Sequence, residues 1–126
     1  MENLRIERKR DCLGIVFDAI TGVLVMTGAS YPENPVEFFA PLYAWLKRYI
    51  AEINRPLTVN ITINYLNTSS SKCLLDFLEL LDRYYEAGGT VTVNWYYEDG
   101  DEDMQETGEE LCEDLMLPYQ VIPLPQ

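Results

Sequence analysis

Residues 57–72, LTVNITINYLNTSSSK, carry the clearest pattern in the chain, and the expected architecture follows from them. Over residues 57–65 apolar and polar side chains alternate, and the apolar set is Leu57, Val59, Ile61, Ile63 and Tyr65. A period of two predicts a strand with one packed face, while the intervening Thr and Asn residues form a polar second face. Four hydroxyl residues, 68–71, separate this strand from a helical pattern.

Helical patterns flank this strand on both sides. Before it, Asn34-Pro35 has the residue types of an N-cap and a first helical position. The apolar stripe that follows repeats every three or four residues and stops at Arg55-Pro56. It consists of Val36, Phe39, Tyr43, Leu46, Ile50 and Ile53, and Trp45 and Tyr49 widen it. After the strand, Gly88-Gly89 ends a second stripe, which consists of Leu74, Phe77, Leu78, Leu81, Tyr84 and Tyr85.

The remaining segments extend the sheet. Residues 91–97 repeat the alternation of apolar side chains with Thr and Asn, and a helix between two such strands predicts a parallel crossover. Residues 4–8, 12–20 and 23–27 predict an antiparallel meander with a turn at Thr21-Gly22. Residues 104–115 predict a short acidic helix with Leu111 and Leu115 on its buried side, and residues 119–122 predict an edge strand.

These elements predict the fold class. Both central strands carry polar residues on their second face, so the helices should lie on one side of the sheet. We therefore expect a single α/β (α+β) domain over residues 1–126, in which a mixed sheet has its helices packed mainly on one face.

Charge excludes several classes of partner. Nine Lys and Arg against 21 Asp and Glu give a net charge of −12, and residues 98–114 hold ten of the acids and no base. Such a chain repels phosphate backbones and anionic lipid, so we expect neither nucleic acid nor membrane as a partner. Its apolar runs are much shorter than the roughly 20 residues of a transmembrane span, and no signal-peptide pattern opens the chain. We expect a cytoplasmic protein.

Composition also argues against catalysis and against a metal site. The chain has no histidine, which is the commonest general base and zinc ligand. Its three cysteines lie far apart and are expected to be buried apolar side chains. An EF-hand spacing is partly matched by Asp99, Asp101, Asp103 and Glu110, but Met104 stands where that loop needs glycine. We expect no enzyme, no cofactor and no metal.

The hydroxyl cluster before the second helix has two interpretations. One of its residues can cap the helix, which stabilises it by about 1 kcal/mol. Alternatively a hydroxyl accepts a phosphoryl group, which adds roughly −1.5 to −2 charges beside the partial positive charge of the helix N-terminus. The second interpretation predicts a binding surface that is switched by phosphorylation.

Two stretches resemble the signature motifs of the SiaC family of bacterial regulatory phosphoproteins: residues 30–34, SYPEN, and residues 65–70, YLNTSS. The resemblance covers nearly the whole chain and implies a fold like that of STAS-type anti-sigma-factor antagonists. It further implies that a SiaB-like kinase phosphorylates Thr68 and that a PP2C-like, SiaA-like phosphatase removes the phosphate. The unphosphorylated form would activate a SiaD-like diguanylate cyclase, which raises cyclic di-GMP and promotes aggregation or biofilm formation.

The resemblance also implies a contact surface around Thr68, formed by Tyr31, Pro32, Glu33, Asn34, Leu66, Asn67, Ser69, Ser70 and Lys72. Several alternatives stay open. Residues 69–71 compete with Thr68 as acceptors, and residues 31–35 form either a plain helix entry or part of the partner surface. Lys72 either steadies the phosphate or is solvated. The other functions considered are a small enzyme that uses Glu33 and a STAS-like antagonist that binds an anti-sigma kinase.

Overall fold

The computed structural model describes residues 1–125, which contain six strands and three helices. In chain order these are β1 (Leu4–Ile6), β2 (Gly14–Phe17), β3 (Val23–Ser30), α1 (Pro35–Glu52), β4 (Leu57–Leu66), α2 (Thr68–Glu86), β5 (Val91–Glu98), α3 (Glu102–Cys112) and β6 (Tyr119–Leu124).

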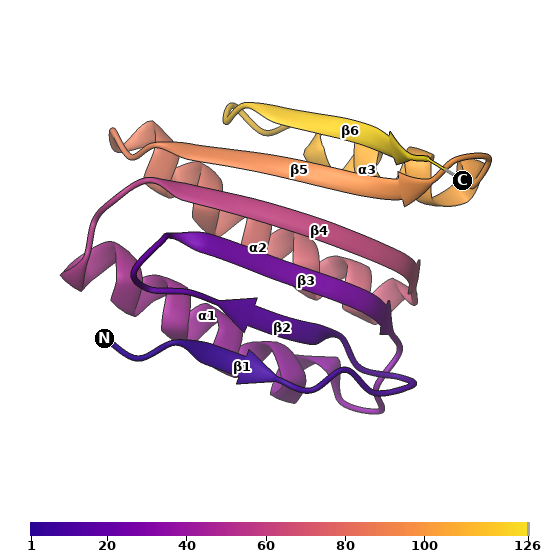
Figure 1. The fold of residues 1–126 in the computed structure, drawn as a ribbon, viewed down its shortest axis with the longest axis horizontal. Coiled ribbons are helices and arrows are strands. Elements are labelled where there is room, and N and C mark those ends of the chain that lie inside the picture. The colour runs from indigo at the N-terminus through magenta and orange to yellow at the C-terminus, as the bar shows by residue number, and fades with distance from the viewer. Residues whose placement is uncertain (126) are drawn as a thin grey trace.

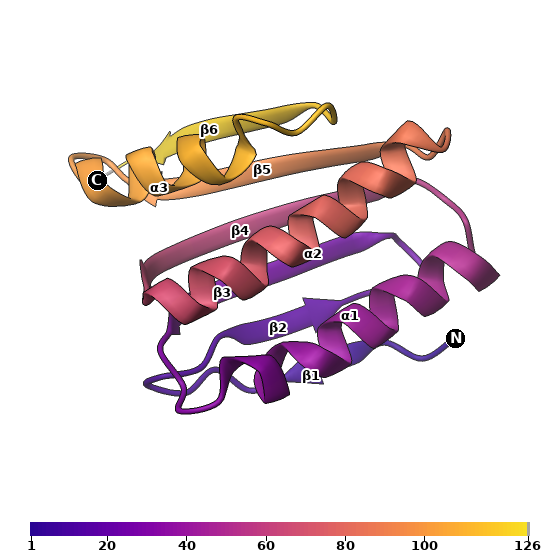
Figure 2. The same ribbon diagram turned by 180° about the vertical axis from the view of Figure 1, so that it is seen from behind.

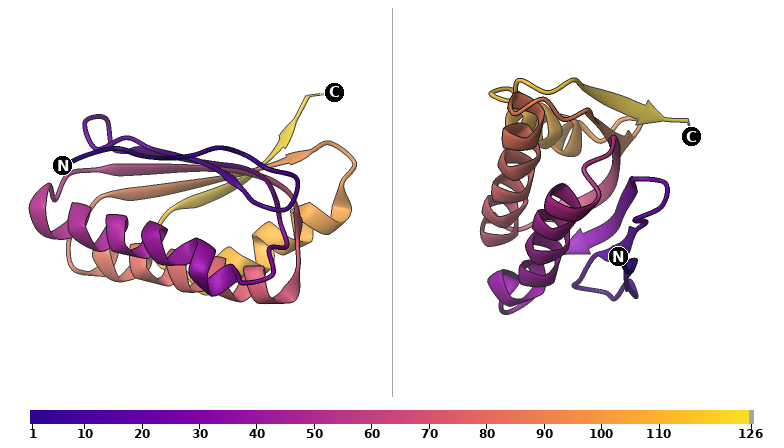
Figure 3. Two further views of the ribbon diagram at one scale, coloured as in Figure 1. Left: turned by 90° about the horizontal axis from the view of Figure 1, so that it is seen from below. Right: turned by 90° about the vertical axis from the view of Figure 1, so that its left-hand side faces the viewer.

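All six strands form one sheet, in which the spatial order equals the chain order (Figure 1). The first three strands pair antiparallel, and β3 to β6 pair parallel, with one helix in each parallel connection. Figures 2 and 3 show the three helices on the same face of the sheet. The mixed α/β fold with one-sided helices is thus confirmed.

The two faces of the sheet differ as the alternation predicts. On the covered face Leu24, Val59 and Val93 lie side by side across three strands and are fully buried. On the open face the Asn94 amide donates a hydrogen bond of 2.9 Å to the Asn60 side-chain oxygen. Parallel sheets are normally covered on both faces. Here polar side chains make the second face compatible with water.

Helix α1 begins at Pro35 as predicted, and apart from Val36 the predicted stripe is buried or packs against the core. Val36 is 67% exposed, whereas the buried positions are Phe39, Leu42, Trp45, Leu46 and Tyr49. Leu42 is the one buried position that the pattern did not include, and aromatic packing holds Trp45 and Tyr49 on this face as predicted. Trp45 stacks on Tyr49 with ring centroids 5.3 Å apart and packs 5.2 Å from the ring of Phe17.

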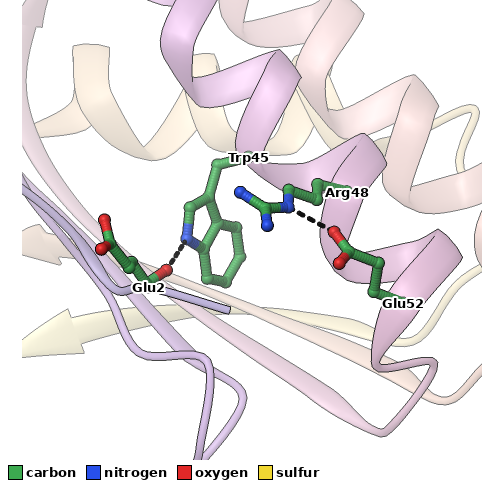
Figure 4. A network of polar contacts seen from close by, with 4 residues as sticks. All are labelled: Glu2, Trp45, Arg48 and Glu52. Carbon is green, nitrogen blue, oxygen red and sulfur yellow. Dashed lines mark hydrogen bonds and ion pairs between the residues drawn. The ribbon is translucent and has the colours of Figure 1, made fainter.

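Trp45 also fixes the start of the chain. Its indole Nε1 donates to the Glu2 carbonyl at 2.9 Å (Figure 4). The same view shows the Arg48–Glu52 ion pair along α1. Both partners of that pair are exposed, so it contributes little to stability.

Two predictions for the later helices are wrong in detail. Tyr85 of α2 is 37% exposed rather than buried. Helix α3 spans Glu102–Cys112, so Leu115 lies beyond its end, and its fully packed positions are Met104, Gly108 and Cys112. Leu111 and Leu115 are half-buried and do pack against the core, as predicted. The indole of Trp95 explains this choice of face, because a Cβ at Gly108 would lie 2.4 Å from its Cδ1 atom. Glycine lets the helix lie directly on that ring.

The early strands also differ from their predicted lengths. Strand β2 ends at Phe17, because the carboxylate of Asp18 accepts the backbone N–H groups of Ile20 and Thr21 and forms a turn. Strand β3 continues to Ser30, three residues beyond the prediction. That extension carries the chain to the end of the sheet where the candidate site lies.

Candidate functional site

The hydroxyl cluster lies at a corner between the end of β4 and the start of α2. Asn67 is the N-cap, and its side-chain oxygen accepts the Ser70 backbone N–H at 2.8 Å. Thr68 is therefore the first helical residue. Since the first-turn N–H groups of a helix lack intrahelical acceptors, the corner has a partial positive charge. In Figure 1 α1 and α2 both start toward the end of the sheet at which β3 and β4 terminate.

The four hydroxyls of the cluster differ in exposure, which sequence alone did not predict. Thr68 and Ser69 are exposed, and Ser71 is half-buried. Ser70 is fully buried. This corrects the prediction that Ser70 contacts a partner, and it also excludes Ser70 as an accessible phosphoacceptor in the folded protein. The accessible first-turn acceptors are Thr68 and Ser69.

Ser70 joins the corner to the end of β3. The Ser30 hydroxyl donates to the Ser70 oxygen over 2.9 Å, and both residues are fully buried. The Asn67 backbone N–H donates to the Ser30 carbonyl at 3.1 Å. Ser30, the first residue of the SYPEN stretch, therefore links the end of β3 to the first turn of α2 through two hydrogen bonds. Sequence reasoning missed this role of Ser30, and its place at the start of the SYPEN stretch was the one signal for it.

The loop after Ser30 lies beside this corner. Tyr31 is 38% exposed, Glu33 and Asn34 are exposed, and Pro32 is half-buried. Asn34 caps α1, since its side-chain oxygen accepts the Glu37 N–H at 3.1 Å. The loop is thus a helix entry, as one alternative predicted. Its exposed residues also leave it available as a contact surface.

Leu66 and Lys72 complete the predicted set. Leu66 is half-buried and packs against the core. Lys72 is exposed and makes no ion pair within residues 1–125. It stands four residues after Thr68, the spacing at which side chains of one helix are neighbours. Its ammonium group therefore lies on the same helix face as Thr68, within reach of a group attached to that residue.

One residue of this corner was assigned to the wrong face. Tyr65 continues the apolar alternation of β4, yet its side chain is 51% exposed. It packs edge-on against Tyr31, with ring centroids 5.7 Å apart. The period-two pattern contains no signal for this outward turn.

The three cysteines have thiols with raised pKa values. Burial raises the pKa of the Cys73 thiol and raises that of Cys112 to about 11. Burial and then Asp11 raise the pKa of Cys12, which is only half-buried, contrary to the expectation that it is a core side chain. Thiols with raised pKa values are weak nucleophiles near neutral pH. The cysteines therefore provide no activated group.

The described part of the chain contains neither a group of metal ligands nor a membrane-spanning helix. Within residues 1–125 no three His, Cys, Asp or Glu side chains are grouped so that they could hold a metal ion. None of the three helices in that range has the length and apolar character needed to cross a membrane.

Comparisons with known proteins agree on one family. The model for the SiaC family regulatory phosphoproteins matches residues 6–124. A crystal structure of apo-SiaC from Pseudomonas aeruginosa is 35% identical, with a TM-score of 0.91, over 98% of this chain and 100% of that one. A second crystal structure contains the P. aeruginosa diguanylate cyclase SiaD in complex with its activator SiaC; the match is 36% identical with a TM-score of 0.92, over 96% of this chain and 99% of that one.

Proposed function

The chain belongs to the SiaC family of regulatory phosphoproteins, and from this premise we propose that it is a binding protein switched by phosphorylation of Thr68. The observation that carries the proposal is the exposure of Thr68 at the first position of α2, directly after the Asn67 cap. A kinase can reach this hydroxyl without unfolding the protein. Ser69 is the competing acceptor, and the family motif favours Thr68.

The corner is suited to accept a phosphate without loss of fold. A phosphoryl group adds roughly −1.5 to −2 charges and three acceptor oxygens. The partial positive charge of the helix N-terminus offsets this negative charge, and the Lys72 ammonium four residues further on adds to the effect. Because Thr68 is exposed, the phosphate stays hydrated in the free protein.

The same phosphate would weaken the binding of a partner that covers Thr68. A surface that fits against a neutral threonine would have to remove water from a dianion, which is far more costly than burying a hydroxyl. Phosphorylation therefore releases the partner while the fold persists. In this proposal the protein acts by binding its partner and is not itself an enzyme.

The partners follow from the family. SiaC of P. aeruginosa activates the cyclase SiaD and forms a crystalline complex with it. We assign a diguanylate cyclase as the output partner here, so that the unphosphorylated protein raises cyclic di-GMP and promotes biofilm formation or aggregation. A SiaB-like kinase and a PP2C-like, SiaA-like phosphatase set the phosphorylation state. The kinase and the cyclase consume ATP and GTP. We therefore assign the phosphorylation of Thr68 and the activation of the cyclase to the cytoplasm.

The test compares phosphorylation and binding in matched variants. The diguanylate cyclase of the organism that makes this protein is titrated with wild type, Thr68→Ala, Thr68→Asp and the control Ser69→Ala. Mass spectrometry after kinase treatment locates the phosphate. We expect phosphate on Thr68, wild-type affinity for both alanine variants, and at least tenfold weaker binding for Thr68→Asp and for the phosphorylated protein.

Equal cyclase affinity of the wild type, Thr68→Ala, Thr68→Asp and phosphorylated proteins would rule out the switch. Purification of tagged wild type from native cells distinguishes the cyclase from an anti-sigma kinase, which is the alternative output partner.

A further inference from the structure

A β-bulge directs Tyr65 away from the core. Strand β4 pairs with β3 in regular register as far as Ile63 opposite Gly28, but the next pair is Tyr65 opposite Ala29. Asn64 is thus an extra residue in β4. Without it, the alternation that buries Ile61 and Ile63 would bury Tyr65 as well. Bulges occur next to functional sites, where they redirect a side chain.

The redirected ring is held in place by a second ring. Tyr31 lies edge-on to Tyr65, with an angle of 77° between the ring planes. The Tyr31 backbone N–H donates to the Asp11 carbonyl at 2.9 Å, and the preceding residue, Ser30, is anchored by Ser70. Two large rings are therefore exposed in a fixed arrangement, and a partner need not order them on binding. Rigid aromatic side chains of this kind dominate the energetics of protein interfaces.

This aromatic pair adjoins Thr68. Tyr65 stands three residues before Thr68, so the chain between them spans at most about 10 Å. A stable interface buries about 800 Å² on each partner, which corresponds to a patch roughly 30 Å across. A partner centred on Thr68 is therefore large enough to reach Tyr65 and the Tyr31 ring that packs against it.

We propose that Tyr65, together with Tyr31, is the apolar anchor through which the unphosphorylated protein binds its diguanylate cyclase. The proposal rests on the proposed function. It assigns the affinity for the cyclase to Tyr65 and Tyr31, whereas phosphorylation of Thr68 switches the binding. The cyclase surface that fits is an apolar recess without a phosphate-binding cluster. Within residues 1–125 the Tyr65 hydroxyl has no hydrogen-bond partner, so the recess must also supply a polar atom or a water for it.

The experiment measures cyclase affinity for tyrosine variants of the unphosphorylated protein. Tyr65→Ala and Tyr31→Ala each remove one ring of the pair, and Tyr65→Phe removes only the hydroxyl. Tyr85→Ala is the matched control, because Tyr85 is 37% exposed but lies near the far end of α2, about 25 Å from Thr68. Circular dichroism and kinase-dependent phosphorylation of Thr68 verify the fold of each variant.

We expect Tyr65→Ala and Tyr31→Ala to weaken cyclase binding at least tenfold, Tyr65→Phe to weaken it severalfold, and Tyr85→Ala to change it less than twofold. If folded Tyr65→Ala and Tyr31→Ala bind like wild type while Thr68→Asp still abolishes binding, the anchor assignment is wrong and the switch stands. If Tyr65→Ala does not fold, Tyr31→Ala decides. If wild type binds no cyclase, the proposed function fails and the anchor fails with it.

Discussion

Replacing Ser70 by alanine is expected to destabilise the protein by about 1–3 kcal/mol, although the change removes a single oxygen atom. The Ser70 oxygen accepts the hydroxyl hydrogen of Ser30 at 2.9 Å, and neither residue is exposed to water. Ser70→Ala thus leaves the Ser30 hydroxyl buried with no acceptor. The penalty for an unpaired buried hydroxyl exceeds the net contribution of the hydrogen bond itself, which is about 1 kcal/mol.

The same reasoning makes the double variant more stable than the single variants would suggest. Ser30→Ala alone leaves the Ser70 hydroxyl without its donor and is expected to cost about 1–2 kcal/mol. In Ser30→Ala/Ser70→Ala no hydroxyl is left unpaired, so the double variant should lose at most about 1 kcal/mol. The cost of the double variant should therefore fall below the sum of the single costs by at least about 1 kcal/mol.

Urea unfolding measured by tryptophan fluorescence tests this cycle, because Trp45 and Trp95 are both buried in the fold and become exposed on unfolding. Ser69→Ala is the control, since Ser69 is an exposed hydroxyl in the same turn and its loss should change the free energy of unfolding by less than about 0.5 kcal/mol. Additive costs for Ser30 and Ser70, or a Ser70→Ala variant as stable as Ser69→Ala, would show that the buried pair does not hold the corner.

Three further perturbations test the fold that supports the corner. Asp82→Ala should cost about 1–3 kcal/mol in urea unfolding, because one carboxylate oxygen accepts two backbone N–H groups of the loop before β6; Asp82→Asn, which keeps an oxygen acceptor, should cost less. Gly108→Ala should cost about 1–3 kcal/mol and alter tryptophan fluorescence, since its methyl group would overlap Trp95; unchanged spectra and stability would contradict the packing. Backbone hydrogen bonds from Thr21 and, second, from Ile20 lower the pKa of the Asp18 carboxylate. The ionised carboxylate therefore stabilises the fold at any pH above its unfolded pKa of about 3.9. This stabilisation is lost as the pH falls through the lower pKa of the folded state. The urea midpoints of wild type and Asp18→Asn should converge from pH 5 to pH 2, and a constant gap would refute this assignment.

Local sequence patterns predicted the fold correctly where neighbouring residues alone determine the secondary structure and the buried face. The alternation in residues 57–63 and 91–97 fixed the faces of two strands, because a single-residue slip would exchange packed and solvated side chains. Asn34 marked a helix start, because its side-chain oxygen caps a free N–H group. At the second helix the cap is Asn67 rather than one of the four hydroxyl residues that were expected to cap it. The hydroxyl cluster was correctly expected at the start of a helix.

The errors arose where contacts between distant segments decided the outcome. The exposure of Tyr65 depends on the β-bulge at Asn64, where β4 has one residue more than β3. A bulge is defined by the pairing of two strands, so the sequence of one strand does not predict it. The burial of Ser70 depends on Ser30, forty positions earlier. Within residues 68–71 all four side chains carry hydroxyls, so only the packed structure separates Ser70 from its exposed neighbours.

The separation of these roles explains how one corner can change charge without unfolding. Ser70 faces inward and holds the first turn of α2 against β3, whereas Thr68, two residues earlier, faces solvent. Under the proposed switch, a phosphate on Thr68 would alter the surface presented to a partner and leave the buried hydrogen bond intact. If stability and switching shared one hydroxyl, phosphorylation would melt the turn and displace the Tyr31–Tyr65 pair. With two hydroxyls, phosphorylation can block binding while the anchor rings keep their arrangement, so that dephosphorylation restores binding without refolding.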